Sequence, residues 1–254
     1  MPQSDPIRKS FFDVLARAES VSDLLFYTSC LLSIASVFLT KESPYGLYNI
    51  VMISFAVCVV ITFILGNPIR MYFSPRAEDN RRKDFFSHAM DVSLTHEKTD
   101  GYYNNDIKKP YRRMAAMVLE NSLFSKTIIL RMLSHERFKV ILVLVIWLIV
   151  IIYRDSDYGI ILATSQAVFS EQVIARWWRL EWLHSRFEKT YDRIFDLFRT
   201  KSNAKEFDAT VLDITSFYET SKSNASISLS SKIFESINPA TSKEWEQIKN
   251  TLKI

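Results

Sequence analysis

Chemically versatile side chains gather in the stretch "DGYYNNDIKK", which runs from Asp100 to Lys109 between two apolar parts of the chain. Adjacent aromatic rings offer faces on which a nucleobase can stack, and basic side chains donate hydrogen bonds to phosphate. The residues of this hypothetical recognition loop are Tyr102, Tyr103, Asn104, Asn105, Lys108, Lys109, Arg112 and Arg113. Two alternatives stay open. One tyrosine packs beneath helices while the other meets lipid, or the pair forms a subunit contact.

A second group of polar residues interrupts the last long apolar run of the chain. Its members are Gln166, Ser170 and Glu171. Gln166 and Ser170 are four residues apart, so they share one face of a helix. A carboxylate at membrane depth is costly unless it is paired, protonated or facing water. These residues are therefore candidates to line a wet pathway in an oligomer. The alternative is that Glu171 lies near the cytoplasmic interface and pairs with Arg176 or Arg70.

The sequence contains no recognisable motif of an enzyme or a metal site. It has no glycine-rich phosphate loop, no Cys-x-x-Cys and no His-Glu-x-x-His pattern. The four histidines lack the spacing of metal ligands. We therefore predict no catalytic residue, no metal and no cofactor, and we expect no direct binding of DNA.

Composition indicates a helical fold. Only four glycines occur in 254 residues, which argues against nucleotide-binding α/β folds and against all-β folds rich in turns. A mean hydropathy of +0.02 together with 24% charged residues indicates two unlike populations of residues. Both cysteines, Cys30 and Cys58, lie within apolar runs, which predicts buried thiols and no disulfide.

The apolar residues fall into four runs, at 24–40, 47–66, 138–153 and 158–175. A helix needs about 20 apolar residues to cross a bilayer. The alternative is a soluble bundle of buried helices, but the second and third runs lack the polar face that such helices carry. Short connections join the first run to the second and the third to the fourth. We therefore predict an all-α membrane protein with four transmembrane helices arranged as two hairpins.

Basic residues orient the predicted hairpins. Of the 32 lysines and arginines, only Lys41 and Arg154 lie in the hairpin tips. Because positive charge is retained on the cytoplasmic side, both termini and the central segment are expected in the cytoplasm. The predicted segments are a cytoplasmic N-terminal part (1–23), hairpin 1 (24–66), a cytoplasmic helical mid-segment (67–137), hairpin 2 (138–175) and a cytoplasmic helical C-terminal region (176–254).

Local signals predict several cytoplasmic helices. One is expected to start at Ser74-Pro75, and another at Pro110, continuing into the third apolar run. An apolar line predicts a helix after the fourth run, formed by Leu180, Leu183, Phe187, Tyr191, Ile194 and Phe198. Next we expect a short helix around 207–218 and a serine-rich linker at 221–232. A last short helix is predicted to begin near Thr241.

The stretches "RRKDFF", "GYYNN" and "ENSLFSKTI", set between two apolar hairpins, resemble those of bacterial four-transmembrane effectors. These effectors include the SMODS-associated four-transmembrane class and relatives found beside nucleotide-signalling or retron modules. The resemblance covers about residues 20 to 200. It implies antiviral defence by abortive infection, in which a phage-triggered signal leads to membrane disruption or pore formation and then to growth arrest or death. It assigns no role to an individual residue.

Together these observations predict a pore-forming effector of the bacterial inner membrane that forms homo-oligomers in the lipid bilayer. Its trigger is expected to be a nucleotide second messenger or a partner protein of the defence system. The first alternative is a non-conducting anchor that holds a cytosolic partner at the membrane. The second is a membrane enzyme, for which the sequence suggests no substrate.

Overall fold

Among the residues that the structure describes, every regular element is a helix, as the low glycine content predicts. The computed structural model describes residues 5–37, 39, 46–97, 99, 101, 103, 107–152, 165, 168 and 170–254. The chain forms two compact units. Unit 1 comprises Met1–Val14, Phe73–Leu133 and Leu180–Ile254, and unit 2 comprises Leu15–Tyr72 and Ser134–Arg179.

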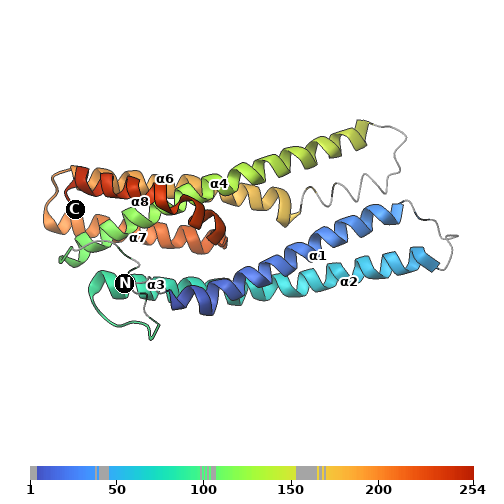
Figure 1. The fold of residues 1–254 in the computed structure, drawn as a ribbon, viewed down its shortest axis with the longest axis horizontal. Coiled ribbons are helices and arrows are strands. Elements are labelled where there is room, and N and C mark those ends of the chain that lie inside the picture. The colour runs from blue at the N-terminus through green and yellow to red at the C-terminus, as the bar shows by residue number, and fades with distance from the viewer. Residues whose placement is uncertain are drawn as a thin grey trace. The chain divides into compact units, whose positions relative to one another are not determined.

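Unit 2 contains a helical hairpin. Helix α1 (Asp13–Val37) and helix α2 (Leu47–Pro68) run side by side in opposite directions (Figure 1). The unit also includes the second part of helix α4 (Pro110–Ile152) and the π-helical turn η4 (Glu171–Ala175). Residues 24–37 of the first apolar run are therefore helical, and so are the described residues of the second and third runs.

The apolar side chains of unit 2 lie largely on its surface. The exposed fraction is 69% for Leu31 in α1, 71% for Phe63 in α2 and 61% for Ile141 in α4. Soluble monomers rarely expose apolar surface over such long stretches of neighbouring residues. Unit 2 therefore has an extended apolar surface.

One helix among the described residues is long and apolar enough to cross a membrane. It runs without a break over Leu47–Met90, and its apolar window has a mean hydropathy of 2.5 with none of its residues buried. The prediction of four spans goes further than this finding. In α4, the uncharged apolar part begins after Glu136, Arg137 and Lys139, and the described helix ends at Ile152, so this part is too short to qualify. Most of the predicted fourth span lies outside the described residues.

Helix α3 begins at Ser74, as Ser74-Pro75 predicted, but it is not a separate helix, and Ser74 does not cap it. Helix α3 (Ser74–Met90) continues from α2 through the π-helical turn η3 (Ile69–Phe73). Pro68 and Pro75 lie on either side of η3, and neither can donate a backbone hydrogen bond. The wider π-helical turn changes the hydrogen-bond register between them, so the chain passes both prolines and stays helical.

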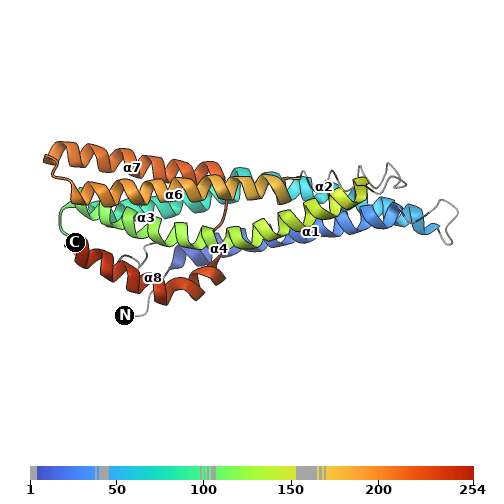
Figure 2. The same ribbon diagram turned by 90° about the horizontal axis from the view of Figure 1, so that it is seen from above.

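Unit 1 is a packed bundle around the first part of α4 (Figure 2). Residues Met114–Leu119 of α4 are fully buried, so helices cover it on more faces than the single predicted stripe. Helix α3 packs against α7 and against the π-helical turn η1. The further elements of this unit are η1 (Arg8–Phe12), α6 (Arg176–Arg199), α7 (Ala204–Ala225) and α8 (Ser231–Leu252).

Several helix predictions for unit 1 are confirmed. Helix α4 begins at Pro110 and continues into the third apolar run without interruption. In α6, the residues Leu180, Leu183, Phe187 and Ile194 of the predicted line are buried. Thr190 and Leu197 complete its buried face, whereas Tyr191 and Phe198 are half-buried.

The C-terminal helices are longer than predicted. Helix α7 is capped by Asn203, whose side chain accepts a hydrogen bond from the Glu206 amide, and it extends to Ala225. Helix α8 begins at Ser231, because the side chain of Ser230 accepts a hydrogen bond from the Ile233 amide. The predicted serine-rich linker is therefore reduced to residues 226–230, and the predicted start near Thr241 was wrong.

Candidate functional site

The connection between α3 and α4 is anchored on a buried carboxylate. Asp84 is fully buried, and its Oδ1 and Oδ2 accept hydrogen bonds from the Thr99 amide (3.1 Å) and hydroxyl (2.7 Å). The Nε2 atom of His88 lies 3.4 Å from Asp84 Oδ1 and 3.1 Å from Thr99 Oγ1. Burial alone would raise the pKa of Asp84, but these hydrogen bonds outweigh it and hold that pKa below its ordinary value. The charged form of Asp84 therefore fastens the connection to α3.

Two members of the predicted recognition loop support this anchor. The ring of Tyr103 packs edge-on against His88 at 5.2 Å and against Phe85 at 6.2 Å between centroids. Arg113 donates hydrogen bonds to the carbonyl oxygens of His88 and Lys108, both at 3.1 Å. Tyr103 thus has the packing role of the alternative interpretation, and Arg113 joins α4 to the end of α3.

The other members of the loop are distributed differently. Lys108 and Lys109 are exposed beside the start of α4. The guanidinium carbon of Arg112 lies 5.7 Å from the centroid of Phe198. Tyr102, Asn104 and Asn105 lie outside the described residues.

Of the predicted pore-lining residues, Gln166 lies outside the described residues, and only the backbone of Glu171 is described, at the start of η4. Ser170 is half-buried, and its hydroxyl oxygen is enclosed with no hydrogen-bond partner among the described residues. Arg176 forms ion pairs with Asp23 and Glu136.

Six residues of unit 2, four of them charged, form a polar group that we term the interface cluster: Asp23, Tyr27, Glu136, Lys139, Gln172 and Arg176. Arg176 lies 3.3 Å from Asp23 and 3.4 Å from Glu136. The Lys139 ammonium lies 2.5 Å from Glu136, and it donates to the Tyr27 hydroxyl and the Gln172 carbonyl. The cluster therefore ties α1 to α4 and to the helical segment around η4.

The interface cluster lies where the exposed apolar residues begin. Asp23 directly precedes Leu24, which is 66% exposed, and Phe138, which is 70% exposed, stands between Glu136 and Lys139. Charged residues stand at the ends of the apolar runs in the sequence. This pattern could have predicted that charged side chains gather where the apolar runs end. The pairing itself joins residues that are distant in sequence.

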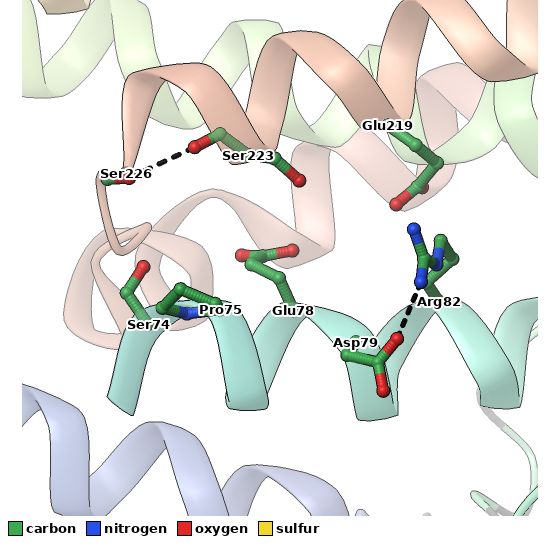
Figure 3. A pocket seen from close by; sticks show the side chains of 8 residues that line it. All are labelled: Ser74, Pro75, Glu78, Asp79, Arg82, Glu219, Ser223 and Ser226. Atoms are coloured by element: carbon green, nitrogen blue, oxygen red, sulfur yellow. Dashed lines mark hydrogen bonds and ion pairs between the residues drawn. The ribbon is translucent and has the colours of Figure 1, made fainter. Parts of the chain in front are cut away.

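A second polar site lies within unit 1, between α3 and α7 (Figure 3). It is a cavity of about 260 Å³ lined by Ser74, Pro75, Glu78, Asp79, Arg82, Glu219, Ser223 and Ser226. Figure 3 shows Ser74, Glu78 and Arg82 reaching from α3 toward α7, and Glu219 reaching from α7 toward α3. No motif in the sequence indicates this site, because its lining comes from two distant segments, 74–82 and 219–226.

Beside the cavity, Glu78, Glu219 and Lys222 form what we term the carboxylate–lysine triad. The Lys222 ammonium lies 2.8 Å from Glu78 Oε2 and 3.5 Å from Glu219 Oε2. Burial raises the pKa of Glu219, since it opposes the charged carboxylate more strongly than Lys222 favours it. For Lys222, burial lowers the pKa, but the two carboxylates outweigh that effect and raise it. Lys222 therefore stays charged.

The described residues contain no group of three histidine, cysteine or acidic side chains able to hold a metal ion. No family model matches the chain, and neither does any curated protein or any solved structure. The described chain thus consists of a helical bundle that contains a polar cavity, and of a second unit with many exposed apolar side chains.

Proposed function

We propose that the protein is an effector of the bacterial cytoplasmic membrane, in which unit 2 spans the bilayer four times and unit 1 is cytoplasmic. On receiving a nucleotide or protein signal, the chain oligomerises and permeabilises or depolarises the membrane, which leads to growth arrest or death in antiphage defence. The observation that carries this proposal is the exposure of apolar side chains throughout unit 2. The helix over Leu47–Met90, which alone among the described residues is long and apolar enough to cross a bilayer, supports its membrane part.

The apolar side chains of α4 are buried in the first part of the helix and exposed in the second part, which favours different surroundings for the two parts. Its residues Met114–Leu119 are buried completely by other helices. Beyond Phe138, the apolar residues Ile141, Ile149 and Ile152 are more than half exposed. Each apolar side chain left in water forgoes about 1.5–3 kcal/mol of burial free energy. Contact with lipid acyl chains would remove this free-energy penalty, because it takes the same side chains out of water.

The composition of the interface cluster favours a position at the surface of the membrane, where water meets lipid. Lys139 and Arg176 have long side chains that can reach toward headgroups while their stems stay in apolar surroundings. Trp178, which follows Arg176 closely, is 67% exposed and has the amphipathic ring typical of membrane interfaces. We therefore assign the cluster to the cytoplasmic face of the bilayer.

The basic residues beside α4 support signal reception in unit 1. Lys108 and Lys109 are exposed next to a connection held by Asp84 and Tyr103. Such donors on a fixed support suit a phosphate-bearing ligand. Gln166, Ser170 and Glu171 are the proposed lining of the leak.

The experiment is inducible expression in bacteria loaded with a potential-sensitive dye, with and without phage infection. Depolarisation that depends on the protein is expected upon infection, and Gln166→Ala with Glu171→Ala should reduce it. A protein that never depolarises cells under any trigger is no effector of this kind. Reporter fusions at residues 43 and 103 should read periplasm and cytoplasm, and the reverse reading would refute the four-span topology.

The alternative function is a non-conducting anchor for a cytosolic partner. Deleting residues 201–254 would not distinguish the anchor from the effector. The deletion removes Tyr218 and Trp245, which are buried in unit 1, so it would disrupt the bundle itself. A sharper test replaces Lys108 and Lys109 by glutamate on an intact bundle. An anchor that uses this surface would lose its partner without any change in membrane potential.

A further inference from the structure

Three cations of α6 surround one aromatic ring of α7. The guanidinium carbons of Arg186 and Arg193 lie 4.8 Å and 5.8 Å from the ring centroid of Phe217, and the Lys189 ammonium lies 5.8 Å from it. The three cations are spaced three and four residues apart, so they share one face of α6. We term these four residues the basic–aromatic cluster. All of them belong to unit 1.

One acid is paired with these three cations. Asp213 accepts a hydrogen bond of 2.5 Å from the Nη2 atom of Arg193. Arg186 and Lys189 take part in none of the ion pairs of the described residues. Three cations and one acid leave a surplus of two positive charges.

The acids of α6 that are nearest to the cluster in sequence do not remove this surplus. Glu188 and Asp192 act electrostatically on Lys126 of α4. Asp196 lies one turn beyond the cluster, and the exposed Arg199 follows it at a spacing of three residues. Like charges three or four residues apart on a helix repel one another. The cluster therefore costs folding free energy as long as no anion lies beside it.

Aromatic rings hold the side chain of Arg186 in place. Its guanidinium carbon lies 5.0 Å from the ring centroid of Trp182, in addition to its contact with Phe217. A guanidinium is planar and carries five N–H donors around its edge, so a ring against its face leaves these donors available. No described residue accepts a hydrogen bond from the Arg186 side chain, which is half-buried. Its donors are therefore fixed in position and open to a ligand.

We propose that the basic–aromatic cluster binds a phosphate monoester. Arg186 donates two parallel hydrogen bonds to the phosphate oxygens, as guanidinium groups commonly do, and Lys189 and Arg193 supply positive charge. A phosphate monoester carries a charge of about −1.5 to −2 at pH 7, which matches the surplus of two positive charges. A phosphodiester carries a single negative charge and would leave half of this surplus uncompensated.

The test is calorimetric titration of the full chain in detergent with glycerol 3-phosphate at pH 8. We expect binding that is about tenfold weaker in Arg186→Gln and clearly weaker in Lys189→Gln, since each substitution removes a charged donor. Arg186→Lys should also weaken binding, because an ammonium cannot form the two parallel bonds. Lys205→Gln removes an exposed cation of α7 outside the cluster and is the matched control, with unchanged affinity.

A second ligand separates a soluble monoester from a lipid headgroup. Glycerophosphoglycerol is the phosphodiester headgroup of phosphatidylglycerol, and it should bind more weakly than glycerol 3-phosphate to the wild type. Equal affinity for the two would overturn the proposal in favour of contact with anionic lipid. Unchanged affinity in Arg186→Lys would overturn it as well, because charge alone would then account for binding.

Two further results would also overturn the proposal. One is the lack of binding to the folded wild type, and the other is unchanged affinity in Lys189→Gln. Lys189 is exposed, so this variant decides the matter if the Arg186 variants do not fold. The titration needs no membrane potential. A negative result therefore leaves the proposed effector function standing, and a failed depolarisation assay leaves the phosphate site standing.

Discussion

The ammonium of Lys222 in α7 lies 2.8 Å from the Oε2 atom of Glu78 in α3. Both side chains are largely enclosed, with 15% and 16% of their surface exposed. Helix α3 continues the helix that, among the described residues, is apolar and long enough to cross a membrane. The ion pair therefore holds the C-terminal region of the chain to the end of that helix.

Replacing Lys222 by methionine should destabilise the protein strongly. The substitution leaves Glu78 and Glu219 as neighbouring buried carboxylates without a cation, and the loss of one partner of a buried pair costs about 3–5 kcal/mol. The measurement is the midpoint of thermal unfolding in detergent, followed by tryptophan fluorescence. Lys83→Met, which breaks a half-exposed pair with Asp79, should cost less than about 1 kcal/mol. Equal effects of the two substitutions would contradict the buried triad.

Asp84 should make the protein less stable in acid. Its pKa is lowered in the folded state, so its contribution is complete above the ordinary aspartate pKa and is lost as the pH falls through the lowered value. Asp84→Asn should cost about 1–3 kcal/mol at pH 7, because the hydrogen bonds from Thr99 and His88 lose their charged acceptor. Below pH 4 the gap between wild type and variant should narrow. A gap that stays constant from pH 7 to pH 3 would show that the charge of Asp84 has no part in stability.

Glu219 should act in the opposite direction. Its pKa is raised by burial, so the folded protein takes up this proton before the unfolded chain does. Wild type should therefore gain stability relative to Glu219→Gln as the pH falls from 8 toward the ordinary glutamate pKa. The comparison needs thermal midpoints of both proteins at each pH. A relative loss for wild type over this range would mean that Lys222 dominates the protonation of Glu219.

Membrane insertion of α2 can be tested by placing lysine at two apolar positions of similar exposure, one in α2 and one in α7. Val57 in α2 is 49% exposed and Leu212 in α7 is 45% exposed. Lysine at position 57 should cost about 2.5–3.5 kcal/mol of insertion free energy, whereas lysine at position 212 should cost nothing. The readout is the fraction of protein that stays with membranes after alkaline extraction. If both variants partition alike, α2 does not lie in lipid.

The interface cluster should depend on the shape of Arg176 as well as its charge. Arg176 contacts Asp23 of α1 and Glu136 of α4 together, which a planar guanidinium can do and a compact ammonium does less well. Arg176→Gln should lower stability by about 1 kcal/mol, since the site is partly exposed, and Arg176→Lys by less. Thermal midpoints in detergent rank the three proteins. A lysine variant as weak as the glutamine variant would indicate that packing, not charge, is the main contribution.

Much of the local structure of this protein was predictable from its sequence. The start of α4 at Pro110, its passage into the third apolar run and the buried face of α6 all follow from periodic apolar residues and proline. These signals act over a few residues, so a single sequence contains them. The break expected before Ser74 and the boundaries expected around residues 221–241 were wrong, and both lie where serine and proline are compatible with either a break or a continuing helix.

The candidate sites depend on contacts between distant parts of the chain. The sequence drew attention to Tyr103 and Arg113 as ligands for a signal, and the tertiary structure gives both of them packing and anchoring roles at the end of α3. It did not indicate that Glu78 would meet Lys222, that Asp84 would receive Thr99, or that Asp23 would pair with Arg176. A charged residue in a sequence has many possible partners.

The apolar runs and the scarcity of glycine were enough to predict a helical protein with an apolar helix of membrane-spanning length, because hydrophobicity and backbone preference are properties of short segments. Only the tertiary structure decided which charges are buried together and where a polar cavity remains, because burial and electrostatic pairing arise when helices from distant parts of the chain pack against one another.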